Sequence, residues 1–151
     1  SEVDLLWFGG IGTYVRSKNE SHGDVGDKAN DALRVYGSEL RCRIIGEGGN
    51  LGMTQLGRIE FALHGGRLNT DFIDNSGGVD CSDHEVNMKI LLNHCVAMGD
   101  LTDKQRNQML EQMTDDVSRL VLKNNYRQAQ AISIASVGAV TRLEEYRRLI
   151  N

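Results

Sequence analysis

The sequence predicts an α/β protein, in which a mostly parallel sheet is followed by a C-terminal helical hairpin. Short apolar runs that stop at glycines are the first reason, because buried parallel strands are nearly continuous in apolar residues. The second is the placement of the 17 glycines, which gather at residues 9–12, 46–52, 65–66 and 77–78. The third is the change after residue 100, where only helical periodicity remains.

The composition argues against several classes of partner. The 151 residues carry a formal net charge of −4 and no basic face, which disfavours nucleic acid. No apolar stretch approaches the roughly 20 residues that span a bilayer, and no signal peptide is recognisable. The three cysteines, Cys42, Cys81 and Cys95, are odd in number and lack CxxC spacing. We therefore expect free thiols in a reducing cytoplasm.

The N-terminal run Val3–Phe8 predicts a strand buried on both faces, which ends at Gly9 and Gly10. A parallel strand needs neighbours, so we expect this chain to be an excerpt whose earlier strands precede residue 1. Residues 10–15 match a GxGxxG dinucleotide fingerprint with Val15 in place of its last glycine. The fingerprint requires a helix at that point. Because residues 16–26 are polar and aperiodic, we interpret them as a loop and reject the fingerprint.

A glycine turn at residues 46–52 dominates the middle of the chain. It follows a predicted strand, carries Asn50, and precedes Thr54, a predicted helix N-cap. A strand, a glycine turn and a helix N-terminus suit an anionic or ribose-bearing ligand. The other elements predicted in this part are a helix over 27–36, strands over 41–45 and 67–73, and a helix over 54–63.

A second glycine turn is predicted at Asn75–Val79. Ser82 and Glu85 then form a capping box, which opens a well-buried helix that ends near Met98. Ser82 has two interpretations: a helix cap, or a hydroxyl that meets a ligand carboxylate. Beyond it, a capping box at residues 102–105 begins a long amphipathic helix, and a further helix follows residues 124–125.

No metal or nucleophile chemistry follows from the spacing of the candidate side chains. Asp83, His84 and Glu85 are adjacent and point in different directions, so they favour the helix N-terminus instead of a metal. Cys42 and Cys95 lie in predicted core positions.

Three segments in order, residues 4–14, 46–52 and 70–87, together resemble the large bacterial NAD-specific glutamate dehydrogenases. The smaller glutamate dehydrogenases are similar at lower density. Their cofactor domain has an E-G-A-N turn, matched here by residues 47–50, and N-A-G-G-V followed by serine, matched by residues 75–79 and Ser82. This chain departs from them with Gly49 and Ser76 for alanines, and with Gly9-Gly10 for a proline-alanine pair.

The resemblance implies a partial Rossmann-like, doubly wound sheet, with residues 1–99 as the second half of an NAD-binding domain and residues 100–151 as a helical segment packed on it. The implied cofactor contacts for NAD are Gly9, Gly10, Gly48, Gly49, Asn50 and Asn75. The implied contacts for L-glutamate or 2-oxoglutarate are Val79 and Ser82. No catalytic residue and no metal ligand is assigned to this chain.

The implied reaction is oxidative deamination of L-glutamate to 2-oxoglutarate and ammonia, with hydride transfer to NAD. The catalytic lysine and aspartate would lie upstream, so we expect the isolated chain to be inactive. We expect a cytoplasmic homo-oligomer for the whole enzyme. The competing hypothesis is a non-catalytic module whose glycine turns only pack. Asn50, Asn75 and Ser82 discriminate between the two, because a packing turn has little use for all three.

Overall fold

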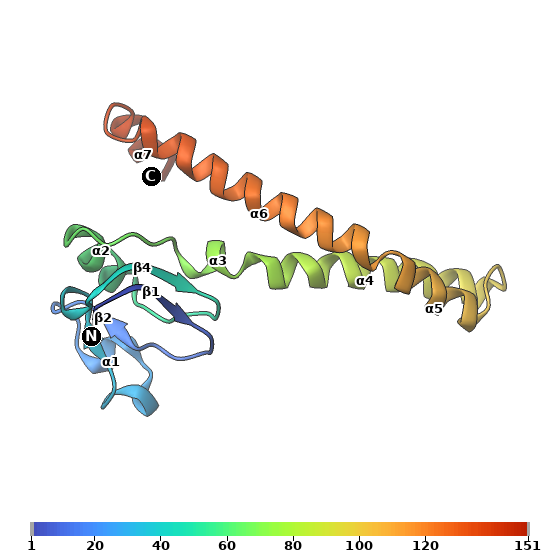
Figure 1. Ribbon diagram of the computed structural model, residues 1–151, viewed down its shortest axis with the longest axis horizontal. Coiled ribbons are helices and arrows are strands. Elements are labelled where there is room, and N and C mark those ends of the chain that lie inside the picture. Colours follow the sequence, from blue (N-terminus) through green and yellow to red (C-terminus); the bar gives the residue numbers. More distant parts are fainter. Residues whose placement is uncertain (1, 151) are drawn as a thin grey trace. The chain divides into compact units, whose positions relative to one another are not determined.

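A computed structural model describes residues 2–150, which group into two compact units that divide between Ser76 and Gly77. The first unit combines short helices with parallel strands, and the second is helical (Figure 1). The chain is thus a mixed α/β protein, as predicted. The assignment of residues 1–99 to one domain and 100–151 to another stays a prediction.

The strands of the first unit pair in parallel. Strand β1 (Val3–Phe8) lies beside β4 (Cys42–Glu47) along the whole length of both, and both strands were predicted (Figure 1). A second parallel pair joins β2 (Val15–Arg16) to β3 (Val35–Tyr36). No helix begins within residues 10–15, where the dinucleotide fingerprint requires one, so rejecting the fingerprint is confirmed.

The core of this unit lies on one side of the β1–β4 pair. Its fully buried side chains are Val15, Ile45, Met53 and Phe61. The prediction that β1 is buried on both faces is wrong for this chain. Its alternate residues Val3, Leu5 and Trp7 are 46%, 54% and 56% exposed. The reason is that side chains alternate along a strand, and the described residues cover one face of the pair.

The helix predicted over residues 27–36 is wrong. The structure instead has a 3-10 turn at Lys28–Asn30, followed by β3. The short helix α1 (His22–Val25) lies upstream, within residues 16–26, which were predicted to be a loop. The buried Arg34 side chain donates from Nε to the Thr13 carbonyl oxygen at 2.8 Å and from Nη2 to that of Asp27 at 2.5 Å. These contacts between residues distant in sequence override the local preference for a helix. The apolar residues whose spacing suggested the helix are largely solvent-exposed.

Helix α2 (Gln55–Leu63) confirms the predicted helix almost to the residue. Thr54 caps it, because its Oγ1 accepts the Gly57 N–H at 2.9 Å. The chain leaves the helix at Gly65, whose φ of +90° suits glycine. The strand predicted over 67–73 is wrong: Arg67 forms one bridge to Ile44, and a one-turn helix, α3 (Asp71–Asp74), follows.

Glu60 of α2 connects its helix by hydrogen bonds to residues 17–18 and to Ser38. Its carboxylate accepts the Lys18 N–H at 2.8 Å, the Ser38 N–H at 2.9 Å and the Ser17 hydroxyl at 2.8 Å. Burial alone raises a carboxyl pKa, but these hydrogen bonds lower the pKa of Glu60 to about 2. The stabilisation is therefore fully present above pH 4.5, the ordinary pKa, and is lost as the pH falls toward 2.

Glu60→Gln is expected to lower the free energy of unfolding by about 1–3 kcal/mol at pH 7. The deficit should shrink as the pH falls from 4.5 toward 2, because the wild-type carboxylate is then also neutralised. Urea unfolding at several pH values measures it. The exposed Glu111→Gln serves as the control with no such pH-dependent deficit. A Glu60→Gln deficit of constant size across that range would contradict the role assigned to the charge.

The second unit is a helical hairpin. It contains α4 (Ser76–Met98, shared at its first residue with the other unit), α5 (Asp103–Gln112), α6 (Thr114–Val137) and α7 (Leu143–Ile150). The chain runs out along α4 and returns along α5 and α6 (Figure 1). Among the described residues, none of the helices has both the length and the apolar character to cross a bilayer.

Two cross-helix hydrogen bonds define the antiparallel order of the hairpin. Asn124 of α6 donates to Asp80 near the start of α4 at 2.9 Å, and Arg106 of α5 donates to Asn93 near the end of α4 at 2.8 Å. The α5–α6 arm therefore runs antiparallel to α4. The capping box at Thr102 is confirmed. The helix break predicted at residues 124–125 is wrong, because the Asn124 side chain is engaged across the hairpin instead of capping a new helix.

The second predicted glycine turn is also wrong. Helix α4 begins at Ser76 and runs through Gly77 and Gly78, so Ser82 lies inside a helix and caps nothing. The Ser82 hydroxyl donates to the Gly78 carbonyl one turn earlier, at 3.1 Å. Glycine lowers helix propensity but packing overrides it: a Cβ at Gly77 would lie 3.3 Å from the Asn125 side chain of α6. The predicted burial of α4 is wrong as well, since much of its apolar surface is exposed.

Candidate functional site

The loop after β4 is closed by a buried ion pair. Strand β4 continues through Glu47, two residues beyond its predicted end, so the loop covers residues 48–53. The Glu47 side chain is fully buried. Its carboxylate accepts Arg58 Nε at 2.7 Å and Nη2 at 3.0 Å, and the Met53 N–H at 3.1 Å. One carboxylate thereby joins the loop's beginning, its end and helix α2.

Helix α3 supplies two further carboxylates to the same loop. Asp71 accepts the Leu51 N–H at 2.8 Å, and Asp74 accepts the Glu47 N–H at 3.0 Å. Together with Met53, three backbone N–H groups of this segment are already bonded to carboxylates. A phosphate would meet these negative charges in place of open donors. The arrangement disfavours the anionic alternative for this turn and leaves the ribose-bearing one.

Arg58 is the cation that balances these acids. Its Nη2 lies 3.2 Å from Asp71 Oδ1, Nε and Nη2 donate to Glu47, and Nη1 donates to Gln55 Oε1 at 3.2 Å. Burial by itself lowers the pKa of Arg58, but the hydrogen bond and charge of Glu47 and the charge of Asp71 outweigh burial and raise it. The guanidinium is thus permanently charged and fixes the site's frame.

Asn50 and Asn75 come together. Asn75 Nδ2 donates to Asn50 Oδ1 at 2.6 Å, although 25 residues separate them. Asn50 is exposed in the loop, and Asn75 is the C-cap of α3. Two polar side chains are thus presented side by side after the carboxyl end of β4, where ligands bind in open α/β sheets. Their roles toward a cofactor stay predictions.

Of the four glycines predicted to contact the cofactor, Gly48 and Gly49 serve close packing. A Cβ on Gly49 would lie 2.7 Å from the Gly10 carbonyl oxygen, and one on Gly48 would lie 2.6 Å from Trp7 Nε1. Gly9 and Gly10 have open space where a Cβ would be. Gly48 therefore leaves room for the Trp7 ring of β1, and Gly49 lets the loops after β1 and β4 touch. These packing roles do not exclude a cofactor role.

Val79 and Ser82 lie on helix α4, three residues apart and therefore on one face. Val79 is 63% exposed, and Ser82 is exposed as well. Both side chains are accessible for a ligand. The structure removes the helix-cap interpretation of Ser82, because the residue is internal to α4.

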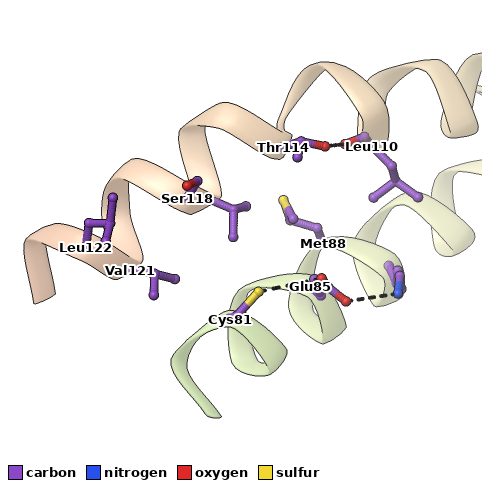
Figure 2. A pocket seen from close by; sticks show the side chains of 10 residues that line it. Cys81, Glu85, Met88, Leu110, Thr114, Ser118, Val121 and Leu122 are labelled. Atoms are coloured by element: carbon purple, nitrogen blue, oxygen red, sulfur yellow. Dashed lines mark hydrogen bonds and ion pairs between the residues drawn. The ribbon is translucent and has the colours of Figure 1, made fainter. Parts of the chain in front are cut away.

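A mainly apolar groove of about 410 Å³ lies between α4 and the α5–α6 side of the hairpin (Figure 2). None of the predicted site residues lines it. The Cys81 thiol faces Glu85 Oε1 at 3.6 Å, and Glu85 also pairs with Lys89 at 3.3 Å (Figure 2). Partial burial and the Glu85 carboxylate raise the pKa of Cys81, which argues against a nucleophilic thiolate.

Histidine and acidic side chains do not gather as metal ligands in residues 2–150: no group of three or more His, Cys, Asp or Glu is placed to hold an ion. His84 Nε2 lies 3.6 Å from Asp80 Oδ1, one turn earlier on the helix. The pair is local to α4 and brings in no residue from the loop at 48–53.

The carboxylate–arginine frame of the site was missed by sequence reasoning. Charged residues far apart in sequence carry no periodic signal, and Glu47 was interpreted as part of a turn. Arg58 offers the one available clue: it lies three residues before the buried Phe61, on the apolar stripe of α2. A charge on such a stripe indicates a buried partner.

Comparison with known proteins identifies relatives along the chain. The family described as "Bacterial NAD-glutamate dehydrogenase, catalytic domain" matches residues 1–135. Proteins named NAD-specific glutamate dehydrogenase are 68% identical over 148 residues in Pseudomonas aeruginosa, 62% over 151 in Halomonas elongata and 54% over 141 in Mycobacterium tuberculosis. These alignments cover 98%, 100% and 93% of this chain, which spans about 9% of each relative's length.

Proposed function

We propose that this chain, which belongs to the bacterial NAD-glutamate dehydrogenase family, is part of an enzyme that deaminates L-glutamate to 2-oxoglutarate and ammonia and passes the hydride to NAD. The observation that carries the proposal is the 68% identity to a protein of that name over nearly the whole chain. Since the chain spans about 9% of that relative, the reaction is proposed for the longer enzyme.

In the proposed site, Gly9, Gly10, Gly48, Gly49, Asn50 and Asn75 border the NAD. Asn50 meets the nicotinamide ribose and Asn75 the nicotinamide side. The hydrogen-bonded amides of Asn50 and Asn75 support the assignment. Neutral donors and acceptors of this kind suit a ribose or an amide better than they suit a phosphate. Val79 and Ser82 contact the glutamate, and their exposure on one face of α4 is compatible with that role.

Residues 1–99 would form the second half of a Rossmann-like, doubly wound NAD domain, and residues 100–151 a helical segment packed on it. The parallel β1–β4 pair supports this arrangement. The catalytic lysine and aspartate would belong to other parts of the enzyme. The residues of this chain would then bind and orient NAD and substrate and exclude water, so the isolated chain should show no turnover. We place the enzyme in the cytoplasm as a homo-oligomer.

Two substitutions in the full-length enzyme test the site. Asn50→Ala is expected to raise the KM for NAD about tenfold, which corresponds to one lost hydrogen bond of about 1.4 kcal/mol. Ser82→Ala is expected to raise the KM for glutamate by a similar factor. Steady-state kinetics with each substrate varied in turn separates the two effects.

The matched control for Ser82 is Ser133→Ala. Ser133 is also exposed, and its hydroxyl makes the same bond to the carbonyl one helical turn earlier, at 2.8 Å. If Asn50→Ala and Ser82→Ala behave like this control, with both KM values unchanged, the competing hypothesis of a packing module is favoured.

A further inference from the structure

The main chain of the loop is strained at Leu51. Its φ is +61°, and among residues 2–150 no other residue besides glycine has a positive φ. A residue with a Cβ pays conformational free energy in this region, and leucine has no short polar side chain to offset it. The Leu51 side chain is 61% exposed, so apolar packing does not explain the conformation.

Asp71 holds Leu51 in place. The Leu51 N–H donates to Asp71 Oδ2 at 2.8 Å. The other oxygen, Oδ1, lies 3.2 Å from Arg58 Nη2 and accepts the Phe72 N–H at 3.0 Å. Arg58 is itself fixed by the buried Glu47. The Asp71 side chain is 13% exposed, so its carboxylate is a rigid acceptor with all of these partners in place.

The C-terminal end of α3 holds the side chain of Asn50, the residue before Leu51. Asn75, which caps α3, donates its Nδ2 to Asn50 Oδ1 at 2.6 Å. One turn of helix therefore fixes the main chain of Leu51 and the side chain of Asn50. With Oδ1 engaged, Asn50 has its Nδ2 donor to offer to a ligand. Such a donor suits a hydroxyl oxygen of a ribose.

We propose that Asp71 is a positioning residue for the cofactor: by holding Leu51 in the left-handed conformation, it keeps Asn50 aligned against Asn75 with its amide donor directed to the ribose of a nicotinamide nucleotide. The inference rests on the cofactor role proposed above for Asn50. It adds a residue that touches no ligand and acts through the loop, and it assigns the strain at Leu51 to cofactor binding.

The test is a set of variants of the full-length enzyme. Asp71→Asn lacks one of the two acceptor oxygens, so it should raise the KM for NAD at least fivefold and leave kcat within threefold. Leu51→Gly, which adopts a positive φ without strain, should leave this KM within twofold. The double variant that combines Leu51→Gly with Asp71→Asn should have a KM for NAD at least threefold lower than that of Asp71→Asn alone. Asp27→Asn is the control, because Asp27 also accepts a backbone N–H, that of Thr13 at 2.9 Å, but lies outside the loop at 48–53.

Because glycine at 51 relieves strain and can also add stability, urea unfolding of every variant accompanies the kinetics. A rescued KM for NAD, measured where each variant is fully folded, separates positioning from a loss of stability. Equal KM values for Asp71→Asn with and without Leu51→Gly would overturn the proposal, as would an equal rise of the KM in Asp27→Asn. Should Asp71→Asn not fold, Leu51→Val provides the readout: a β-branched residue resists positive φ, so the KM for NAD should rise, and an unchanged value overturns the proposal. If Asn50→Ala leaves this KM unchanged, the failure lies in the proposed site itself.

Discussion

Arg58→Met is expected to lower the free energy of unfolding of the first unit by about 3–5 kcal/mol, the range seen when one partner of a buried ion pair is removed. Without the guanidinium, the Glu47 carboxylate, which is 0% exposed, is a buried charge without its ion-pair partner. Trp7, the single tryptophan, belongs to this unit, so urea unfolding followed by its fluorescence reports the change.

A second variant isolates the unpaired charge as the cause. Glu47→Gln combined with Arg58→Met removes the charge but keeps a side-chain oxygen that can accept the Met53 N–H. The double variant should therefore be more stable than Arg58→Met alone, in spite of carrying one more substitution. Thr102→Ala, in the other unit, should leave the Trp7 transition unchanged. A loss below about 1 kcal/mol in Arg58→Met would contradict the assigned role of the pair.

Gly49→Ala is the second large effect expected. The new Cβ would lie 2.7 Å from the Gly10 carbonyl oxygen and 2.9 Å from its carbonyl carbon, so one of the two loops must move. Such overpacking costs about 1–3 kcal/mol. Because Asn50 is the next residue, we also expect the KM for NAD of the full-length enzyme to rise more than tenfold.

Gly48→Ala is the matched comparison for stability. Its Cβ would meet the Trp7 ring, with the closest atom at 2.6 Å, but this side chain is 56% exposed and can turn toward solvent. We therefore expect Gly49→Ala to lose more stability than Gly48→Ala, by urea unfolding of both variants. Equal losses would mean that the Gly10 backbone is not the obstacle.

Local signals account for the parts of the fold that the sequence predicted. The strand, loop and helix from Cys42 to Leu63 follow from an apolar run, a glycine cluster and the Thr54 cap, all of which act over a few residues. The same reasoning was wrong where distant contacts decide. The hydrogen bond of Arg34 to the Thr13 carbonyl oxygen favours a non-helical conformation of residues 27–36. The hydrogen bond of Asn124 to Asp80 across the hairpin lets α6 continue beyond Asn124.

The candidate site divides in the same way. Asn50 and Asn75 were identified through resemblance, and the structure places them in contact. The frame made by Glu47, Arg58 and Asp71 was not predicted, because an ion pair between residues 11 apart leaves no pattern in the sequence. The glycines around it looked like open ligand-binding backbone. In the structure Gly46 and Gly48 leave room for the Trp7 ring, and Gly49 leaves room for the Gly10 backbone of the neighbouring loop.

The parallel pairing of β1 with β4 also has a consequence during synthesis. Val3 pairs with Cys42, 39 residues further along the chain. At roughly 5–20 residues per second, a ribosome completes β1 about two to eight seconds before its partner strand is made. During that interval the edge of β1 that β4 will cover is unpaired, and an unpaired strand edge is a template for pairing with another chain. The edge of β1 that faces β4 is therefore open to mispairing until residue 47 has been made.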